Sequence, residues 1–329
     1  MNEILQLDNV KKYFPIRRSI KQMFRKNHQS YVRAVDGVSL TIEKGKALVV
    51  AGESGSGKTT LARIILRAID PDSGSIVFDG DDITKYEGNK LKKFRTNVQM
   101  IHQDPYTSLD PRMRILDIVM EPLNIHNKIK SKQERIEDVL GSLEEVRLEP
   151  ATDIAEKFPN MLSGGQRQRV AIARSLVLKP KLILADEPVS MLDVSVRAEI
   201  LELLKNLKDR LKLSYLYITH DLSTARYLGD EIGIMYAGKI VEGGPIEQVL
   251  LNPLHPYTQA LLDAISEPEP QNLEKEKIIR IKQGETRDRP HTGCRFIHRC
   301  LYSMDICNSD PLLAGEEDNH YVSCFIYPV

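Results

Sequence analysis

The chain has 329 residues, enough to bury a full hydrophobic core in one large domain with an appendage or in two domains. Hydrophobic residues make up 41% of it and charged residues 28%, which is ordinary for a soluble globular protein. Lys and Arg together number 46, as do Asp and Glu, so the charge balance gives no reason to expect a nucleic-acid partner.

Neither a signal peptide nor a membrane span is expected. The N-terminal sequence MNEILQLDNVKKYF has no apolar region and no cleavage site. No stretch approaches the roughly 18 apolar residues that cross a bilayer. We therefore expect a cytosolic protein that can still dock on a membrane protein. In the cytosol, cysteines are metal ligands or free thiols more often than disulfides.

Short β-type runs alternate with helical patterns, which predicts an α/β fold. The polar, charged stretch 266–290 is typical of a linker. We therefore expect a domain at 1–265 and an extension at 266–329. The predicted elements are strands at 46–52, 181–188 and 215–221, a strand and turn at 74–84, helices at 58–69, 135–148 and 196–211 with further helical periodicity across 105–161, a hairpin turned at Ala237–Gly238, and a proline-interrupted helical segment at 245–265.

The sequence GESGSGKT at 52–59 fits the phosphate-binding pattern G-x-x-x-x-G-K-[ST], and it lies between a predicted strand and a predicted helix. Glycines let backbone N–H groups surround phosphates, and the following helix directs its positive end at the same anion. Lys58 can reach the β- and γ-phosphates, and the Thr59 hydroxyl can ligate Mg²⁺. The expected nucleotide-binding residues here are Gly52, Ser54, Gly55, Ser56, Gly57, Lys58, Thr59 and Thr60.

Two acidic residues end the buried-strand pattern KLILADEP at 181–188. Asp186 can hold Mg²⁺ or its water, and Glu187 can orient an attacking water. Side chains alternate along a strand, but the chain changes direction at its end, so both carboxylates could reach one site. Two solvated acids at the end of a strand are the plain alternative.

LSGGQ at 162–166 resembles the signature sequence of the ATP-binding-cassette (ABC) ATPases, and their other motifs appear in the family's order. QDP at 103–105 is similar to the Q-loop, and SMLD at 190–193 to the D-loop. His220 matches the switch histidine. Tyr13 is placed where the family has an aromatic that stacks on adenine, although Phe14 is adjacent and a packed aromatic is the ordinary alternative.

This resemblance covers about residues 3–265 and implies a P-loop NTPase cassette with a RecA-like core, an antiparallel β subdomain and a helical subdomain at about 105–175. It also implies two nucleotides sandwiched head to tail between two subunits. In that arrangement the signature residues complete the partner's site, and Asp193 acts across the interface. The signature residues are Leu162, Ser163, Gly164, Gly165 and Gln166.

The reaction implied by the resemblance is in-line attack of water on the γ-phosphate of ATP. Lys58 and Mg²⁺ would stabilise the spreading charge, with Mg²⁺ held through Thr59, Gln103 and Asp186. Glu187 is the expected base or water-positioning residue, and His220 would sense the γ-phosphate. A single cassette also fits non-transport ATPases that act on nucleic acid or in translation, and this second class stays open.

Further stretches resemble the peptide and nickel importer branch, among them KYFPIRR at 12–18 and QDPYTSLDPRM at 103–113, which are closest to its F-type (second) ATPase subunit. The resemblance implies a D-type ATPase partner, with a homodimer possible in isolation, two membrane permease subunits and an extracytoplasmic binding protein. The subunit would lie peripherally on the cytoplasmic face of the membrane and dock through Gln103–Met113. The branch also contains oligosaccharide importers, so a sugar substrate is the alternative to a peptide.

Residues 11–34 carry eight Lys or Arg and no acid, with Ile20, Met23 and Phe24 among them. Such a segment can lie close to anionic lipid or to the permease. A solvated insertion loop is the plain alternative.

All four cysteines lie in the last 36 residues, with the spacing C-x5-C-x6-C-x16-C. This spacing lacks the short C-x2-C pairs of most structural zinc sites, and four thiolates can also hold an iron–sulfur cluster. The tail resembles the C-terminal extension of the peptide-importer ATPases, in which such cysteines can bind a 4Fe–4S cluster. We expect that cluster on Cys294, Cys300, Cys307 and Cys324, ahead of zinc or free thiols, with His298 as a possible substitute ligand.

Overall fold

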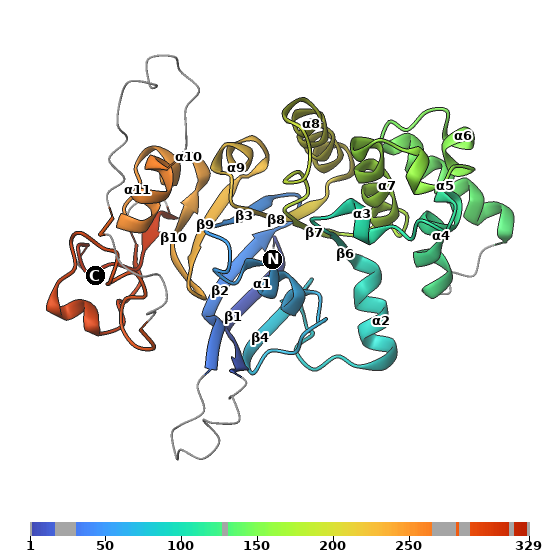
Figure 1. Ribbon diagram of the computed structural model, residues 1–329. Helices are drawn as coiled ribbons and strands as arrows, with labels where there is room; N and C mark the ends of the chain where they lie inside the picture. The colour runs from blue at the N-terminus through green and yellow to red at the C-terminus, as the bar shows by residue number, and fades with distance from the viewer. Residues whose placement is uncertain are drawn as a thin grey trace, which may run out of the picture.

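The molecule is built around one large, mainly parallel β-sheet (Figure 1). The computed structural model describes residues 2–16, 31–126, 131–264, 281–282, 290–315 and 319–327. Within these ranges the sheet comprises β3 (Ala47–Ala51), β6 (Val98–Ile101), β7 (Leu182–Asp186), β8 (Ser214–Thr219), β9 (Glu231–Tyr236), β10 (Lys239–Pro245), β11 (Ala314–Gly315) and β12 (Tyr321–Val322).

The strand order is β11-β12-β10-β9-β3-β8-β7-β6. The strands from β9 to β6 run parallel to their neighbours, whereas β10, β12 and β11 add antiparallel strands at one edge. In the register of the parallel part, Leu48 and Leu184 both face Leu216. The carboxyl ends of parallel strands therefore lie along one edge, where α/β sheets bind their ligands.

A second, antiparallel sheet lies against the first. Its described strands, in the order β2-β1-β4-β5, are β1 (Glu3–Pro15), β2 (Tyr31–Glu43), β4 (Ser73–Phe78) and β5 (Asp81–Asp82). The chain between β1 and β2 includes residues 17–30, so most of the basic segment predicted from the sequence lies outside the described residues.

Most helices lie around the large sheet, and α4, α5 and α6 project together to one side of the molecule (Figure 1). No helix in the described ranges is long and apolar enough to cross a membrane. The helices are α1 (Lys58–Ile65), α2 (Gly88–Asn97), α3 (Pro105–Ser108), α4 (Ile115–Ile125), α5 (Lys132–Glu145), α6 (Ala151–Ala155), α7 (Gly164–Leu176), α8 (Val194–Leu211), α9 (Leu222–Leu228), α10 (Ile246–Leu251) and α11 (Pro256–Asp263), with 3₁₀ turns η2 (Pro159–Met161) and η4 (Asp305–Asn308).

The hydrophobic core has two layers, one on each face of the parallel sheet. Along β3, Val49 belongs to the cluster that includes the helical region and α8, and Val50 to the cluster beneath the antiparallel sheet. This follows from the two-residue period of a strand. Because both faces are covered, the strand sequences are mostly apolar, as those of buried parallel strands usually are.

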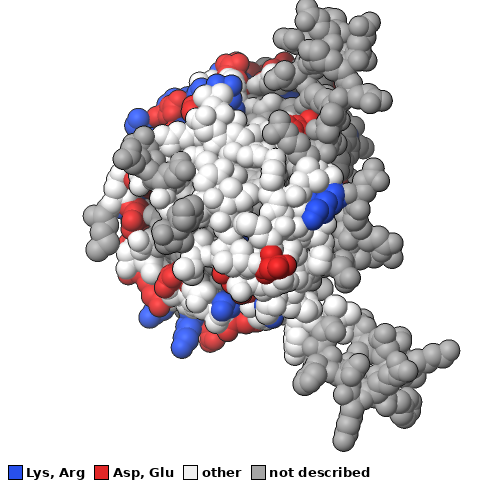
Figure 2. Space-filling view, turned by 90° about the vertical axis from the view of Figure 1, so that its left-hand side faces the viewer, with Lys and Arg blue, Asp and Glu red and all other residues white. Residues whose placement is uncertain are grey.

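The C-terminal segment shares this core. Phe296 and Cys300 are buried in the same cluster as Val49, and β12 pairs with β10. Figure 2 shows the side of the molecule on which this segment lies, and the charged side chains there gather mostly near the margins. The segment is thus fixed to the body by apolar burial and by strand pairing.

Most of the elements predicted from the sequence are confirmed. The hairpin turns at Ala237–Gly238, between antiparallel β9 and β10, and the proline-interrupted segment forms α10 and α11. The expected linker 266–290 lies largely outside the described residues. Its described Ile281 forms an isolated bridge with Cys300.

Substitution of Leu184 by Ala should lower the free energy of unfolding by about 2–5 kcal/mol. Leu184 is fully buried in β7, between β6 and β8, so the shorter side chain leaves a cavity in a layer that cannot collapse around it. Urea unfolding of the purified chain measures the effect. Leu312→Ala, at a side chain 70% exposed, is the control and should change stability by less than about 0.5 kcal/mol; equal losses would contradict this account of the core.

Candidate functional site

A cleft of about 800 Å³ lies at the carboxyl ends of four parallel strands, a size typical of ligand sites. The glycine-rich loop follows β3, Gln103 follows β6, Glu187 follows β7 and His220 follows β8. The lining residues are Phe14, Val32, Arg33, Ala34, Glu53, Ser54, Gly55, Gly57, Lys58, Thr59, Thr60, Gln103, Glu187, His220 and Leu261.

The loop between β3 and α1 needs glycine at two positions where it lies close to the backbone of another strand. A Cβ on Gly52, whose φ is +153°, would lie 2.1 Å from the carbonyl oxygen of Met235. A Cβ on Gly57, whose φ is +115°, would lie 2.0 Å from the carbonyl oxygen of Ala34. Any larger residue at either position would displace backbone of β9 or β2, so these strands fix the shape of the loop.

Lys58 opens α1 and is buried, with its ammonium group pointing back into the loop. Its Nζ donates to the carbonyl oxygens of Gly52 at 2.7 Å and of Glu53 at 2.9 Å. Burial lowers the pKa of Lys58, and the negative charges of Glu187 and Asp186 act against that shift. The cation is thus held at the floor of the cleft by two hydrogen bonds to backbone oxygens.

The Thr59 hydroxyl donates to Asp186 Oδ1 at 3.0 Å. Asp186 is the last residue of β7 and is buried, and burial, with the charge of Glu187 adding to it, raises the pKa of its carboxyl. Hydroxyl and carboxylate oxygens are the donors that Mg²⁺ prefers, so this pair fits a Mg²⁺ site in which a bound phosphate supplies further oxygens.

Glu187 is the meeting point of two other predicted site residues. The Gln103 amide donates to Glu187 Oε2 at 3.0 Å, and His220 Nδ1 lies 3.1 Å from the same oxygen. The backbone of Glu187 is left-handed, with φ 48°, which is uncommon for a residue with a side chain. This turn directly after β7 brings the carboxylate into the cleft beside Lys58.

The signature residues do not line the cleft. Leu162 is buried, and Ser163 caps α7 in a capping box, accepting the N–H of Gln166 at 3.3 Å while Gln166 Oε1 accepts the N–H of Ser163 at 3.1 Å. Gly164 and Gly165 form the first turn of that helix. Asp193, exposed at the start of α8, is also outside the cleft. The start of α7 is therefore a capped helix N-terminus that lies outside the cleft formed at the glycine loop.

The expectation for Tyr13 needs correction, because Phe14 lines the cleft and Tyr13 does not. The two side chains are consecutive on β1 and so face opposite sides. The Tyr13 hydroxyl donates to Asp36, and the Arg33 guanidinium lies 5.3 Å from the centre of the Tyr13 ring. Phe14, 37% exposed, is the aromatic side chain available to a ligand.

Sequence reasoning missed the residues that join the C-terminal segment to this cleft. The Tyr257 hydroxyl accepts the backbone N–H of Glu53, and the Arg299 guanidinium binds the Glu53 carboxylate. Arg295 binds Asp36, the acceptor of the Tyr13 hydroxyl. The available signal was the sequence GCRFIHRC, in which an arginine stands next to each of two cysteines.

The four cysteines line one small cavity of about 10 Å³, roughly the room of a single water molecule. Burial raises the pKa of Cys294 to about 11 and also raises those of Cys300 and Cys324. Within the described ranges, no three His, Cys, Asp or Glu side chains are grouped so as to hold a metal ion. The four cysteines therefore share one cavity but are not grouped as metal ligands in this structure. His298 is exposed and does not line the cavity.

Two parts of the chain match known protein families. Residues 35–190 match the family described as ABC transporter, and residues 241–307 match the family described as Oligopeptide/dipeptide transporter, C-terminal region. The first match includes the glycine loop, the signature residues and both strand-end carboxylates. The second includes Tyr257, Arg299 and three of the cysteines.

Relatives match nearly the whole chain. It is 42% identical to the oligopeptide transport ATP-binding protein AppF of Bacillus subtilis, over 98% of this chain and 97% of that protein. It is 42% identical to the dipeptide transport ATP-binding protein DppF of Haemophilus influenzae, with 98% and 96% covered, and 40% identical to DppF of Escherichia coli, with 98% and 94% covered.

Solved cassettes share the fold. The ATP-binding cassette MJ0796, solved as a dimer in a post-hydrolysis state bound to ADP and phosphate, matches with a TM-score of 0.64 and 31% identity, covering 74% of this chain and 99% of that one. CbiO1 of Clostridium perfringens, part of the ABC transporter complex CbiONQ, matches with a TM-score of 0.64 and 25% identity, covering 77% and 92%. The chain belongs to the ATPases of ABC transporters, in the group with an oligopeptide/dipeptide transporter C-terminal region.

Proposed function

We propose that the cleft binds MgATP and that its residues carry out the hydrolysis. The observation that carries this proposal is the contact of one Glu187 oxygen with both Gln103 and His220. Three strand ends thereby aim a carboxylate into the cleft that Lys58 also lines. Such a carboxylate is placed to orient a water molecule and accept its proton.

The glycine loop would hold the phosphates through the backbone N–H groups of Gly52 and of residues 54–60, and through the Lys58 side chain. The hydroxyl of Ser56 supports this, because it is buried without a hydrogen-bond partner among the described residues. Mg²⁺, when bound, would neutralise phosphate charge, and Thr59, Asp186 and Gln103 are its proposed ligands. Phe14 would stack against the base.

In the proposed reaction, the water oxygen forms a bond to the γ-phosphorus while the bond from that phosphorus to the β–γ bridging oxygen breaks. Glu187 takes the water's proton, Lys58 stabilises charge on the phosphate oxygens, and His220 contacts the γ-phosphate. The products are ADP and phosphate. The signature residues 162–166 and Asp193 would act on the nucleotide of a second subunit, which agrees with their position outside this chain's own cleft.

We further propose that the ATPase drives peptide import, since relatives covering 98% of the chain are oligopeptide and dipeptide transport proteins. Its partners would be a D-type ATPase, two permease subunits and an extracytoplasmic binding protein, and its place the cytoplasmic face of the membrane. The permease contact is proposed around Gln103–Met113. Tyr106 is 56% exposed there. Ser108 of the same stretch lines a groove of about 250 Å³, together with His102 and Ile125 among others.

For the C-terminal region we propose that Cys294, Cys300, Cys307 and Cys324 are the ligands of one metal group, a 4Fe–4S cluster ahead of zinc. The support is that all four line the same cavity. The cavity has to widen for such a cluster, and the buried thiols have to lose protons, so binding would be stronger at higher pH. The proposed division of the chain is a cassette at 1–265, with its helical subdomain at about 105–175, and a Cys-rich extension at 266–329.

Substitution of Glu187 by Gln should leave MgATP binding intact and lower the rate of hydrolysis about 100-fold or more, because the amide cannot accept the proton of the attacking water. Nucleotide affinity and phosphate release are measured on the same preparation. Glu202→Gln, an exposed acid on α8, should keep the wild-type rate. Hydrolysis by Glu187→Gln at a near-normal rate would refute the role given to this residue.

The transported solute is tested through the binding protein that serves this transporter. Peptides of a few residues should raise its melting temperature, because a ligand bound only to the native state stabilises that state. Oligosaccharides serve as the comparison. Stabilisation by sugars alone would replace the peptide proposal with an oligosaccharide importer.

An anaerobic preparation of the full chain should contain about four iron and about four sulfide per chain and show a broad visible absorbance that chelation removes. Cys300→Ser should lose this absorbance. His298→Ala should keep it, since His298 is exposed and outside the cysteine cavity. A colourless preparation loaded with zinc would rule out the cluster.

A further inference from the structure

The second residue of the glycine loop is bound by a side chain from the far end of the chain. Arg299 Nη1 and Nη2 donate to the two carboxylate oxygens of Glu53, each at 2.9 Å. This two-point geometry gives a stronger and more directional contact than a single ion pair. The side chain of Arg299 is only 14% exposed, so water weakens the contact less than at an open surface.

The guanidinium of Arg299 has little freedom to leave this position. It lies 5.5 Å from the centre of the Phe296 ring and 5.9 Å from the centre of the Tyr236 ring. Both rings are buried and contact each other edge to face, 5.3 Å apart. Cation–π contacts with two fixed rings orient the donor before the carboxylate binds.

The backbone of Glu53 is held from the same direction. Its N–H donates to the Tyr257 hydroxyl at 2.8 Å, and the Tyr257 ring packs 4.5 Å from the centre of the Tyr236 ring. Tyr257 therefore holds the main chain of Glu53 and Arg299 holds its side chain. Both residues come after the last parallel strand in the sequence. The loop cannot shift at this residue without breaking both contacts.

Charge gives the contact with Arg299 a consequence for nucleotide binding. Glu53 lines the same cleft as Lys58 and Thr59, and its side chain is 36% exposed. Without a cation beside it, this carboxylate would stand as a negative charge at the edge of a phosphate site. The negative charge of the carboxylate would repel the negative charge of a bound phosphate and so weaken phosphate binding.

We propose that Arg299 is a positioning residue for nucleotide binding, which acts by holding and neutralising Glu53. The inference rests on the assignment of the cleft to ATP. Arg299 itself does not line the cleft, so we expect it to act through Glu53, the lining residue that it binds. The C-terminal segment thereby becomes part of the ATP site.

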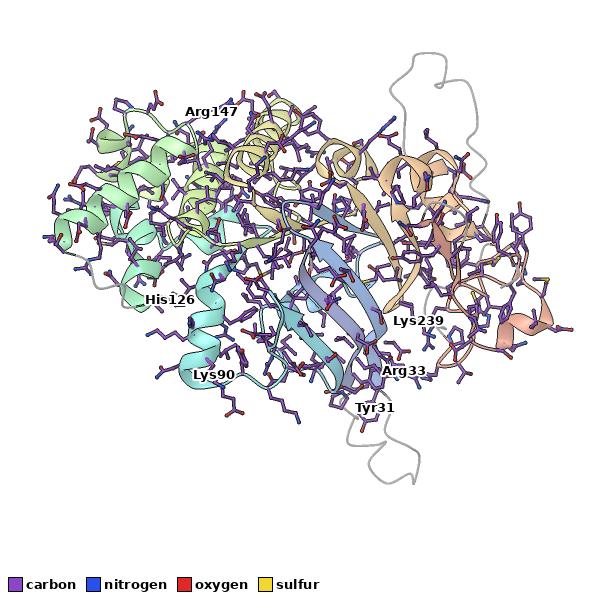
Figure 3. The ribbon with its side chains drawn as sticks, turned by 180° about the vertical axis from the view of Figure 1, so that it is seen from behind. Tyr31, Arg33, Lys90, His126, Arg147 and Lys239 are labelled. Atoms are coloured by element: carbon purple, nitrogen blue, oxygen red, sulfur yellow. The ribbon has the colours of Figure 1, made fainter. Side chains whose placement is uncertain are left out.

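A second link sets the orientation of the same segment without touching the glycine loop. Arg33 Nη1 donates to the backbone carbonyl of His291 at 2.7 Å, and Lys239 pairs with Asp310 at 2.6 Å. Figure 3 shows Arg33 and Lys239 near the C-terminal segment, beside the antiparallel sheet. These contacts do not involve Arg299, so we expect the segment to stay in place and the chain to stay folded when Arg299 is changed.

The test measures the dissociation constant of the non-hydrolysable analogue MgAMP-PNP for the full-length protein. Arg299→Gln should weaken binding about fivefold, the scale of a partly exposed ion pair. Glu53→Gln should change it less than about twofold, because the repelling charge is gone. The double variant should return to within about twofold of wild type. Arg299→Lys, which keeps the charge and loses the two-point geometry, should fall between.

Arg226→Gln is the matched control. Arg226 makes the same two-point contact with Glu247, at 2.9 and 2.8 Å, on a surface that does not line the cleft. Its loss should leave the dissociation constant unchanged. Melting temperatures of all variants show whether the chain stays folded.

Three results would overturn the inference. If Arg299→Gln binds as wild type does, the contact has no role in binding. If Glu53→Gln weakens binding as much as Arg299→Gln and the double variant shows no recovery, the contact is a structural tie and not a neutralising one. If the wild-type chain itself does not bind the analogue, the assignment of the cleft to ATP fails first, and this inference with it.

Discussion

The site depends on the absence of side chains at two points of the glycine loop. Gly52 lies against the backbone of β9, and Gly57 lies against that of β2. The turn at Gly238 joins these two supports, because its N–H donates to the carbonyl of Ser56 and its carbonyl accepts the N–H of Asp36. The loop is thus moulded by both sheets and by the β9–β10 hairpin. The position of Lys58, which directly follows Gly57, depends on that packing.

The positions of the polar side chains at the cleft were largely predictable from the sequence, because these side chains stand at the ends of parallel strands. Each of these side chains stands at or after the carboxyl end of a parallel strand. A local pattern, an apolar run followed by a polar residue, therefore also predicts where the side chain lies in the fold. Lys58, Asp186, Glu187 and His220 are all found in this way. The prediction placed the aromatic side chain of the cleft at Tyr13, one residue before Phe14, which lines it. The sequence does not show which of two consecutive side chains faces the cleft, because that depends on the pleat of β1.

The contacts of the C-terminal segment could not be predicted in the same way. Glu53 and Arg299 are 246 residues apart, and the local sequence around either residue does not predict a contact with the other. Their contact depends on the pairing of β12 with β10 and on the burial of Phe296. Both are features of the tertiary structure. A segment that is remote from the glycine loop in sequence is therefore in direct contact with it in space.

The cysteines and the glycine loop share one short piece of backbone. Arg299 and Cys300 are consecutive, and one side chain contacts Glu53 while the other lines the cysteine cavity. Phe296, between Cys294 and Cys300, packs under the Arg299 guanidinium. Since buried side chains in such a layer cannot move independently, the positions of the thiols and of the arginine are set together. The geometry of this segment is therefore a constraint on the nucleotide cleft as well as on the cysteine cavity.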